Sequence, residues 1–215
     1  RYMKKLQFET YVTGKSPKCA IIGIHGWKGN RFSFKQIAIS LQIPNSEWFF
    51  PEAPYLVDNQ KDKRSWSYEI EPGIWERKEP KKLFDKFLSS EILTKYDSKN
   101  VFFVGFSQGA LICYEYVLYS AHPWAGVFPI AGFIINDPMN KDKRRFHPNQ
   151  KDTPILIGHG TEDDVVKLES SELAYTHLKR KGARVEILTY SGNHKIGIKF
   201  LRRMKQIITS IPELD

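Results

Sequence analysis

Cysteine is scarce in this sequence: only Cys19 and Cys113 occur among 215 residues. Two cysteines cannot build the disulfide framework on which small secreted domains depend, and they match no metal-ligand spacing. Stability must therefore come from the packing of apolar side chains, and a chain of this length can bury a sizeable core. We accordingly expect a protein of a reducing compartment, with the cytoplasm as the expected location.

Long hydrophobic runs are lacking as well. No stretch of the sequence reaches about 18 consecutive apolar residues, the length that a membrane-spanning helix requires. Residues 1–6 also lack the apolar stretch of a secretory signal peptide. We therefore expect no integral association with a membrane.

Acidic residues are fewer than basic ones: 24 Asp and Glu stand against 33 Lys and Arg, which gives a net charge of +9 with histidine neutral. Such an excess is compatible with an anionic partner such as nucleic acid or a membrane surface. Its largest part lies in the first 50 residues, which carry 8 basic and 2 acidic side chains. The sequence has neither a basic stripe with interleaved aromatic residues nor a known nucleic-acid-binding module, so we expect no nucleic-acid partner.

Apolar runs alternate with amphipathic segments along nearly the whole chain. The runs predict strands at 19–25, 47–51, 101–106, 124–131, 154–159 and 184–190, with a weaker one near 6–12. The amphipathic segments predict helices at 33–42, 81–97, 108–121, 168–182 and 195–209. Several runs are continuously apolar, which is typical of parallel strands covered on both faces. The pattern predicts one domain over residues 1–215, a doubly wound and mostly parallel sheet of about seven strands with helices on both faces.

The sequence Gly105-Phe106-Ser107-Gln108-Gly109 lies between a predicted strand and a predicted helix. In this context a G-x-S-x-G motif places its serine on a strained turn, where the flanking glycines permit close approach of the backbone and the hydroxyl projects from the sheet. Serine is a weak nucleophile unless a base, normally a histidine oriented by a carboxylate, activates it. The motif therefore predicts Ser107 as a nucleophile.

The base is expected near the end of the chain, because in α/β-hydrolase order the acid follows the serine and the histidine comes last. Only His194 follows the last predicted strand, just ahead of the terminal helix. The remaining histidines precede the serine or lie in helices, in a basic loop or at an earlier strand end: His25, His122, His147, His159 and His177. We therefore predict that His194 is the base.

For the acid, the strand at 154–159 runs into three adjacent carboxylates, Glu162, Asp163 and Asp164. Spacing alone does not choose among them. Asp137, after the preceding strand, is a further alternative. We favour Asp163, with Asp164 and Asp137 left open.

An acyl-transfer site also needs two N–H donors for the negatively charged oxygen of the tetrahedral intermediate. The first is expected to be the backbone N–H of Gln108, because it directly follows the nucleophile at the positive end of a helix. The second is expected from the loop that begins His25-Gly26-Trp27, with the Trp27 N–H as the donor. Residues Trp27 and Gln108 are thus the predicted oxyanion hole.

With these residues in place, the chain resembles the phospholipase/carboxylesterase family of α/β-hydrolases, which includes acyl-protein thioesterases and small bacterial carboxylesterases. The resemblance extends over about residues 18–209 and rests on the segments His25-Gly26-Trp27, Pro51-Glu52-Ala53-Pro54, Arg64-Ser65-Trp66, Gly105-Phe106-Ser107-Gln108-Gly109-Ala110, Ala125-Gly126-Val127, His159-Gly160-Thr161-Glu162-Asp163 and Gly192-Asn193-His194. The His-Gly-x-x-Asp pattern of the family supports Asp163 as the acid. The chain departs from the family at Asp164, where proline is frequent, and at Trp27 and Lys28 in the oxyanion loop.

The resemblance implies an α/β-hydrolase fold without a large cap domain. It also implies a serine hydrolase that cleaves small-molecule carboxylic esters of short to medium acyl chains through an acyl-enzyme, with no metal or organic cofactor. An acyl-protein thioesterase or a lysophospholipase is the alternative within the family. A catalytically silent binding protein is the alternative outside enzymes, but such a protein would lack a member of the triad. The sequence leaves the oligomeric state open.

Two stretches, 52–80 and 133–152, are longer than ordinary connections. We expect both to be irregular loops that help to form the site, because functional residues concentrate on such segments. Both are rich in aromatic residues. Trp66, Tyr68 and Phe133 are therefore predicted to wall an acyl-binding groove.

Overall fold

The computed structural model describes residues 5–134 and 146–212. Its main sheet contains β1 (Phe8–Val12), β2 (Cys19–Ile24), β3 (Ser46–Pro51), β8 (Val101–Phe106), β9 (Gly126–Ile130), β10 (Ile155–Gly160) and β11 (Val185–Tyr190). These seven strands lie in the order β1-β3-β2-β8-β9-β10-β11. The β1 strand pairs antiparallel with β3, and every other neighbouring pair is parallel. The predicted seven-stranded, mostly parallel sheet is confirmed.

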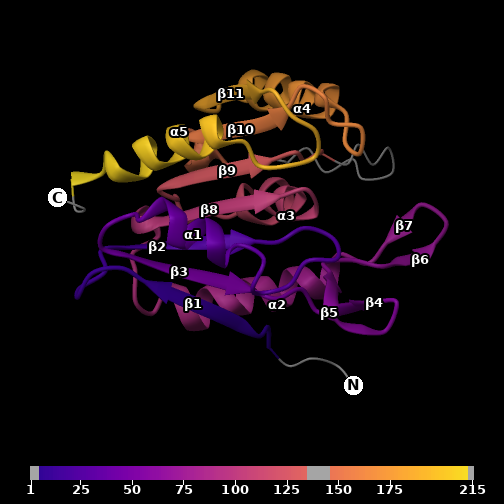
Figure 1. Cartoon of the computed structure of the whole chain (residues 1–215), viewed down its shortest axis with the longest axis horizontal. Helices are drawn as coiled ribbons and strands as arrows, with labels where there is room; N and C mark the ends of the chain where they lie inside the picture. Colours follow the sequence, from indigo (N-terminus) through magenta and orange to yellow (C-terminus); the bar gives the residue numbers. More distant parts are fainter. Residues whose placement is uncertain (1–4, 135–145, 213–215) are drawn as a thin grey trace.

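Helices cover both faces of this sheet (Figure 1). One face is covered by α1 (Lys35–Leu41) and α5 (Ile198–Thr209), whose buried side chains share a core with β2, β8 and β9. The other face is covered by α2 (Lys78–Phe87), α3 (Gln108–Ile112) and α4 (Leu168–Arg180). The α2 and α3 helices each continue into a π-helical turn, at Leu88–Ile92 and Cys113–Val117. The fold is therefore doubly wound, as the alternation of elements predicts.

The apolar strands explain why both faces are covered. All residues of β2 and β10 are buried. Successive side chains of a strand point to opposite faces, and in β2 Ile21 packs in the core beneath α1 and α5, whereas Ile22 packs in the core beneath α2 and α3. A strand that must fill two cores cannot alternate apolar with polar residues, which is why these runs are continuous.

The stretch 52–80 differs from the expected irregular loop. It forms two hairpins, β4 (Tyr55–Val57) with β5 (Gln60–Ser65) and β6 (Glu69–Glu71) with β7 (Ile74–Trp75), before α2 begins at Lys78. The first turn contains Asp58 and Asn59 at φ of 53° and 55°, and the second contains Gly73 at φ of 80°. Asp, Asn and Gly tolerate this left-handed region and favour tight hairpin turns. Both hairpins project at the end of the sheet where the parallel strands terminate (Figure 1).

The second long stretch, 133–152, is described only in part. Asp137 and the basic cluster Lys141–Arg145 lie outside the described residues. Pro148–Gln150 forms a 3-10 turn, and the buried Gln150 side chain donates to the carbonyl oxygens of Ser120 and His122 at 2.7 and 2.6 Å. Across the two described ranges, no helix has both the length and the apolar character needed to span a bilayer.

Candidate active site

Ser107 occupies a strained turn between β8 and α3, with φ of 55° and ψ of −113°. A Cβ atom added to Gly105 would lie 2.2 Å from the carbonyl oxygen of Gly109, and one added to Gly109 would lie 2.1 Å from the carbonyl oxygen of Ile24. Both glycines of the motif are therefore required by close contacts between backbones. The Ser107 N–H donates to the carbonyl oxygen of Ile130 in β9 at 2.8 Å, which fixes the turn to the sheet.

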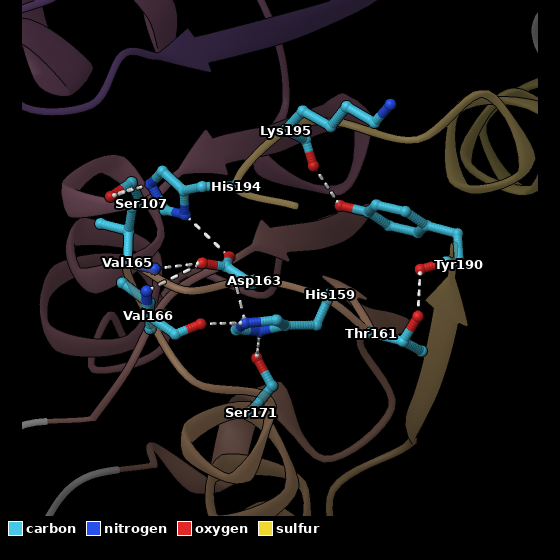
Figure 2. A network of polar contacts seen from close by, with 10 residues as sticks. All are labelled: Ser107, His159, Thr161, Asp163, Val165, Val166, Ser171, Tyr190, His194 and Lys195. Carbon is cyan, nitrogen blue, oxygen red and sulfur yellow. Dashed lines mark hydrogen bonds and ion pairs between the residues drawn. The ribbon is translucent and has the colours of Figure 1, made fainter. Parts of the chain in front are cut away.

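The structure brings Ser107, His194 and Asp163 together, as Figure 2 shows. The Nε2 atom of His194 lies 3.1 Å from Oγ of Ser107, and its Nδ1 lies 2.8 Å from Oδ2 of Asp163. These residues follow β8, β10 and β11, which end at one edge of the sheet. The His194 ring also packs on the Phe106 ring, with 4.8 Å between the centroids. The imidazole is thus held between a hydroxyl and a carboxylate.

Asp163 has hydrogen bonds at both carboxylate oxygens. Its Oδ1 accepts the backbone N–H groups of Val165 and Val166, each at 2.9 Å, while Oδ2 faces His194. Burial alone would raise the pKa of this carboxyl, but the bond from His194 and the amides of Val166 and Val165 outweigh burial and lower the pKa below its usual value. Asp163 is therefore held as a carboxylate. Its neighbour Asp164 is exposed, so of the two only Asp163 reaches His194.

Contacts between the acid loop and the His194 loop set the position of His194. The carboxylate of Glu162 accepts the N–H of Gly192, and the N–H of Glu162 donates to the carbonyl oxygen of Gly192 at 2.9 Å. A Cβ atom on Gly160 would lie 2.3 Å from that carbonyl oxygen, so glycine is needed for the two loops to meet. The bond from Gly192 also lowers the pKa of Glu162.

The N–H groups of Trp27 and Gln108 remain the candidates for the oxyanion hole. A Cβ atom added to Gly26 would lie 3.3 Å from Cβ of Ser107, so the loop after β2 touches the nucleophile. This loop turns sharply, with Lys28 at φ of 66° and a bond from the Gly29 N–H to the Gly26 carbonyl at 3.0 Å. Among the described residues, the N–H groups of Trp27 and Gln108 have no hydrogen-bond acceptor. Both remain available to a ligand.

His25 has a role that the sequence analysis did not assign. Its buried ring accepts the N–H of Ala53 at Nε2, at 3.0 Å, and its Nδ1 therefore carries the proton that binds the carbonyl oxygen of Gly26 at 2.7 Å. Burial lowers the pKa of His25 to about 4, so the ring is neutral at pH 7. A polar residue at the end of an apolar strand is the sequence signal for such a role.

The side chain of Gln108 also has a role beyond its predicted N–H. Its Oε1 accepts the N–H of Trp66 at 2.9 Å, and its Nε2 donates to the hydroxyls of Ser65 and Ser67 at 3.0 and 3.2 Å. The residue after the nucleophile thereby holds the end of the first hairpin against the site. No spacing rule in the sequence links residues 65–67 to Gln108.

The predicted substrate-binding residues do not form a common wall. Trp66 is 1% exposed and donates its indole N–H to the carbonyl oxygen of His25 at 2.9 Å, so it offers no surface to a substrate and that prediction is corrected. Tyr68 is 47% exposed and packs edge-on against Tyr55, with 4.8 Å between the ring centroids. Phe133 is half-buried and lines a pocket of about 340 Å³ with residues of α4. Of the three residues, Tyr68 alone is strongly exposed.

Cysteine offers no rival nucleophile. Both Cys19 and Cys113 are free and buried. Burial raises the pKa of Cys19 to about 12 and raises that of Cys113 further, so neither forms a thiolate at neutral pH. In the part of the chain that the structure describes, no group of three or more His, Cys, Asp and Glu is placed to hold a metal ion.

Known proteins share both the sequence pattern and the fold. The sequence pattern of the family described as Phospholipase/Carboxylesterase matches residues 7–211. The carboxylesterase SOBER1 of Arabidopsis thaliana is 29% identical over 182 residues, which cover 79% of this chain and 78% of that protein. An acyl-protein thioesterase 1 of Cryptococcus neoformans is 26% identical over 188 residues, covering 77% and 76%.

Among solved structures, the esterase PE8 superposes with a TM-score of 0.80 and 21% identity, covering 96% of this chain and 99% of that one. This likeness confirms the expected α/β-hydrolase fold. The family match extends over nearly the whole chain and includes every segment that approaches Ser107. The chain therefore belongs to the phospholipase/carboxylesterase family and is a hydrolase of the carboxylesterase type.

Proposed function

We propose that Ser107, His194 and Asp163 form a catalytic triad that hydrolyses carboxylic esters of short to medium acyl chains. The continuous contact from the hydroxyl to the carboxylate carries this proposal, with 3.1 Å from Oγ to Nε2 and 2.8 Å from Nδ1 to Oδ2. Both distances are within the range in which a base accepts a proton from its nucleophile. The membership of the family supports an ester substrate.

In the first half of the reaction, Oγ of Ser107 attacks the carbonyl carbon of the ester while Nε2 of His194 takes the hydroxyl proton. Asp163 holds the other nitrogen of the ring as the donor and stabilises the imidazolium that forms. His194 then gives its proton to the leaving alcohol, and the acyl group stays on Ser107. In the second half, His194 activates a water molecule that releases the carboxylic acid and restores the hydroxyl.

The negative charge of each tetrahedral intermediate falls on the former carbonyl oxygen. We assign its two donors to the N–H groups of Trp27 and Gln108, because the loop of Gly26 touches Ser107 and α3 begins at Gln108. Each such donor contributes about 3 kcal/mol of transition-state stabilisation. His25 and the Gln108 side chain keep the two donor segments in place through the bonds described above.

We base the proposed preference for short and medium acyl chains on the small size of the segments around the site. Between β3 and α2, the described chain adds only two small hairpins to the sheet. Tyr68 follows Ser67, whose hydroxyl accepts a hydrogen bond from Gln108, and we therefore assign Tyr68 to the acyl side of the site. Two small hairpins give a long acyl chain little apolar surface on which to be buried, and this is our reason for proposing short and medium chains.

Labelling with a fluorophosphonate probe, together with hydrolysis of p-nitrophenyl acyl esters, tests the proposal. We expect the wild type to be labelled at Ser107 and to turn over the butyrate ester faster than the dodecanoate ester. The Ser107→Ala variant should show neither labelling nor turnover, while Ser67→Ala, which removes a nearby hydroxyl, should still be labelled. Labelling of Ser107→Ala would refute the assignment.

An acyl-protein thioesterase or lysophospholipase activity is the second candidate. It is supported by the similarity to acyl-protein thioesterases of several fungi. The same triad would cleave either bond, since only the leaving group differs. Comparing kcat/KM for an acyl ester, a matched acyl thioester and a lysophospholipid separates the candidates: a higher value for the thioester or the lysophospholipid would replace the carboxylesterase assignment.

A further inference from the structure

We propose that His159 is a positioning residue for Asp163. His159 is the penultimate residue of β10, and its side chain is fully buried directly beside the carboxylate (Figure 2). Its Nε2 lies 2.6 Å from the carbonyl oxygen of Val166 and 3.3 Å from Oδ2 of Asp163. Its Nδ1 lies 2.6 Å from Oγ of Ser171 in α4. This histidine opens the His-Gly-x-x-Asp pattern, but the hydrolytic mechanism gives it no step.

The surroundings of Nε2 determine where the ring carries its proton. The atom faces two oxygens, the carbonyl of Val166 and the Oδ2 of Asp163, and neither oxygen has a proton to donate. A bare nitrogen lone pair in this buried position would face two oxygens that carry negative charge. Nε2 therefore carries the hydrogen that binds the carbonyl oxygen of Val166, and the same nitrogen lies 3.3 Å from Oδ2 of Asp163. On the other side of the ring, Nδ1 meets the hydroxyl of Ser171.

The N–H of His159 reaches the acid in two ways, through its closeness to one carboxylate oxygen and through the backbone of Val166. It lies against Oδ2, the same oxygen that accepts Nδ1–H of His194. It also binds the carbonyl oxygen of Val166, whose own N–H binds Oδ1 of Asp163 at 2.9 Å. His159 thus fixes the turn 163–166 around the carboxylate, and with it the angle at which Asp163 meets His194.

Ser171 and the core hold the imidazole itself. Ser171 is fully buried in α4, which packs on β10 and β11. The chain of polar contacts therefore runs from Ser107 through His194, Asp163 and His159 to Ser171 (Figure 2). Because a small displacement of a catalytic group costs up to about 100-fold in rate, loss of His159 should lower kcat rather than raise KM.

Two substitutions of His159 distinguish the contribution of Nε2 from that of Nδ1. In His159→Asn the amide remains near Nδ1, so a partner for Ser171 is kept but the donor towards Asp163 is lost. In His159→Gln the longer amide places a donor near the position of Nε2. We expect His159→Asn to lower kcat for an acyl ester by about 10- to 100-fold with KM little changed, and His159→Gln to recover part of that loss.

Two further variants control for folding. Met204→Ala truncates a fully buried side chain of α5 in the opposite core and should lower the melting temperature without a matching loss of kcat. Ser171→Ala frees the imidazole without opening a large cavity, so it keeps the test valid if His159→Asn does not fold. We expect a loss of kcat in Ser171→Ala that is smaller than in His159→Asn. Full kcat in a folded His159→Asn or, where that variant does not fold, in Ser171→Ala would overturn the proposal.

This inference rests on the proposed triad, so one readout must be independent of turnover. A proton on Nδ1 of His194 bound to the Asp163 carboxylate gives a proton NMR signal far downfield. We expect this signal to move upfield or broaden in His159→Asn, to be retained in His159→Gln and to be unchanged in Met204→Ala. An unchanged signal in His159→Asn would contradict the role of His159, whereas turnover that survives in Ser107→Ala would instead contradict the proposed function.

Discussion

The burial and hydrogen bonds of Asp163 indicate that its contact with His194 is specific. Its side chain is fully buried, and both of its oxygens have partners, the amides of Val165 and Val166 on one side and His194 on the other. These bonds hold its pKa below the usual value although burial opposes them. A carboxylate that is ionised, buried and aimed at an imidazole is suited to orient that ring and stabilise its positive form.

Replacing this carboxylate by an amide should therefore affect catalysis more than folding. In Asp163→Asn the side chain keeps its shape but no longer stabilises the imidazolium of His194, and we expect kcat to fall on the order of 10⁴-fold with little change in KM. Steady-state hydrolysis of a p-nitrophenyl ester measures the loss, and circular dichroism verifies the fold. The exposed neighbour gives a matched control, because Asp164→Asn should keep the wild-type kcat; a loss of similar size in both variants would contradict the assignment of the acid.

His25 makes the stability of the protein sensitive to acid. Its pKa is lowered to about 4 in the folded state and is about 6.5 in the unfolded chain. Between these values the unfolded state binds more protons, so the free energy of unfolding falls as the pH falls. From pH 7 to pH 5 we expect His25 to account for a loss of about 2 kcal/mol, measured by urea denaturation at the two pH values.

A comparison of two histidine variants isolates this effect. The loss on acidification should be smaller by about 2 kcal/mol in His25→Asn. It should be unchanged in His122→Asn, which alters an exposed histidine. Equal losses in the wild type and both variants would show that His25 does not titrate in this range.

At the scale of elements, the nucleophile turn depends on how closely α3 approaches β2. The carbonyl oxygens of Ile24 and His25 lie 2.1 and 2.9 Å from the position of a Cβ atom on Gly109. Any side chain at this position must therefore push the helix away from the strand. The first turn of α3 carries the N–H of Gln108, so the same displacement would move this proposed oxyanion donor away from Ser107.

The variant Gly109→Ala tests this dependence. We expect it to lower the free energy of unfolding by about 1–3 kcal/mol, as overpacking does, and to lower kcat by tenfold or more because a displaced catalytic group loses rate steeply. Gly73→Ala is the control: its Cβ meets nothing within 4 Å, so only its φ of 80° is unfavourable. That strain costs about 1–2 kcal/mol, and the activity should be unchanged. Wild-type kcat in Gly109→Ala would show that the close approach is not required.

The elements also show where reasoning from the sequence succeeded and where it stopped. The strands of the sheet are predictable because, in an α/β chain, a continuous apolar run indicates a strand that is buried on both faces. The β4–β5 hairpin was missed because its second strand, Gln60–Ser65, is entirely polar, so only the turn at Asp58 and Asn59 signalled it. Trp66 was misplaced for the converse reason, since an aromatic residue in a polar stretch can face the core as readily as a groove.

At the scale of the whole molecule, topology explains why residues so far apart in sequence meet. Ser107, Asp163 and His194 follow β8, β10 and β11, and parallel strands all end at one edge of the sheet. The order of motifs along the chain was therefore enough to predict that Ser107 and His194 converge, whereas the choice of Asp163 over Asp164 and Asp137 also needed the His-Gly-x-x-Asp pattern of the family. The supporting contacts, such as Gln108 with Ser65 or His159 with Val166, depend on side-chain directions within loops, which no periodicity encodes.

We propose that this fold presents Ser107 as a nucleophile towards an ester. Steady-state hydrolysis of p-nitrophenyl butyrate by the wild type and by Ser107→Ala, with circular dichroism of both, tests it most directly. We predict measurable turnover by the wild type and a loss on the order of 10⁶-fold in kcat for the folded variant. Substantial turnover by a correctly folded Ser107→Ala protein would contradict the account.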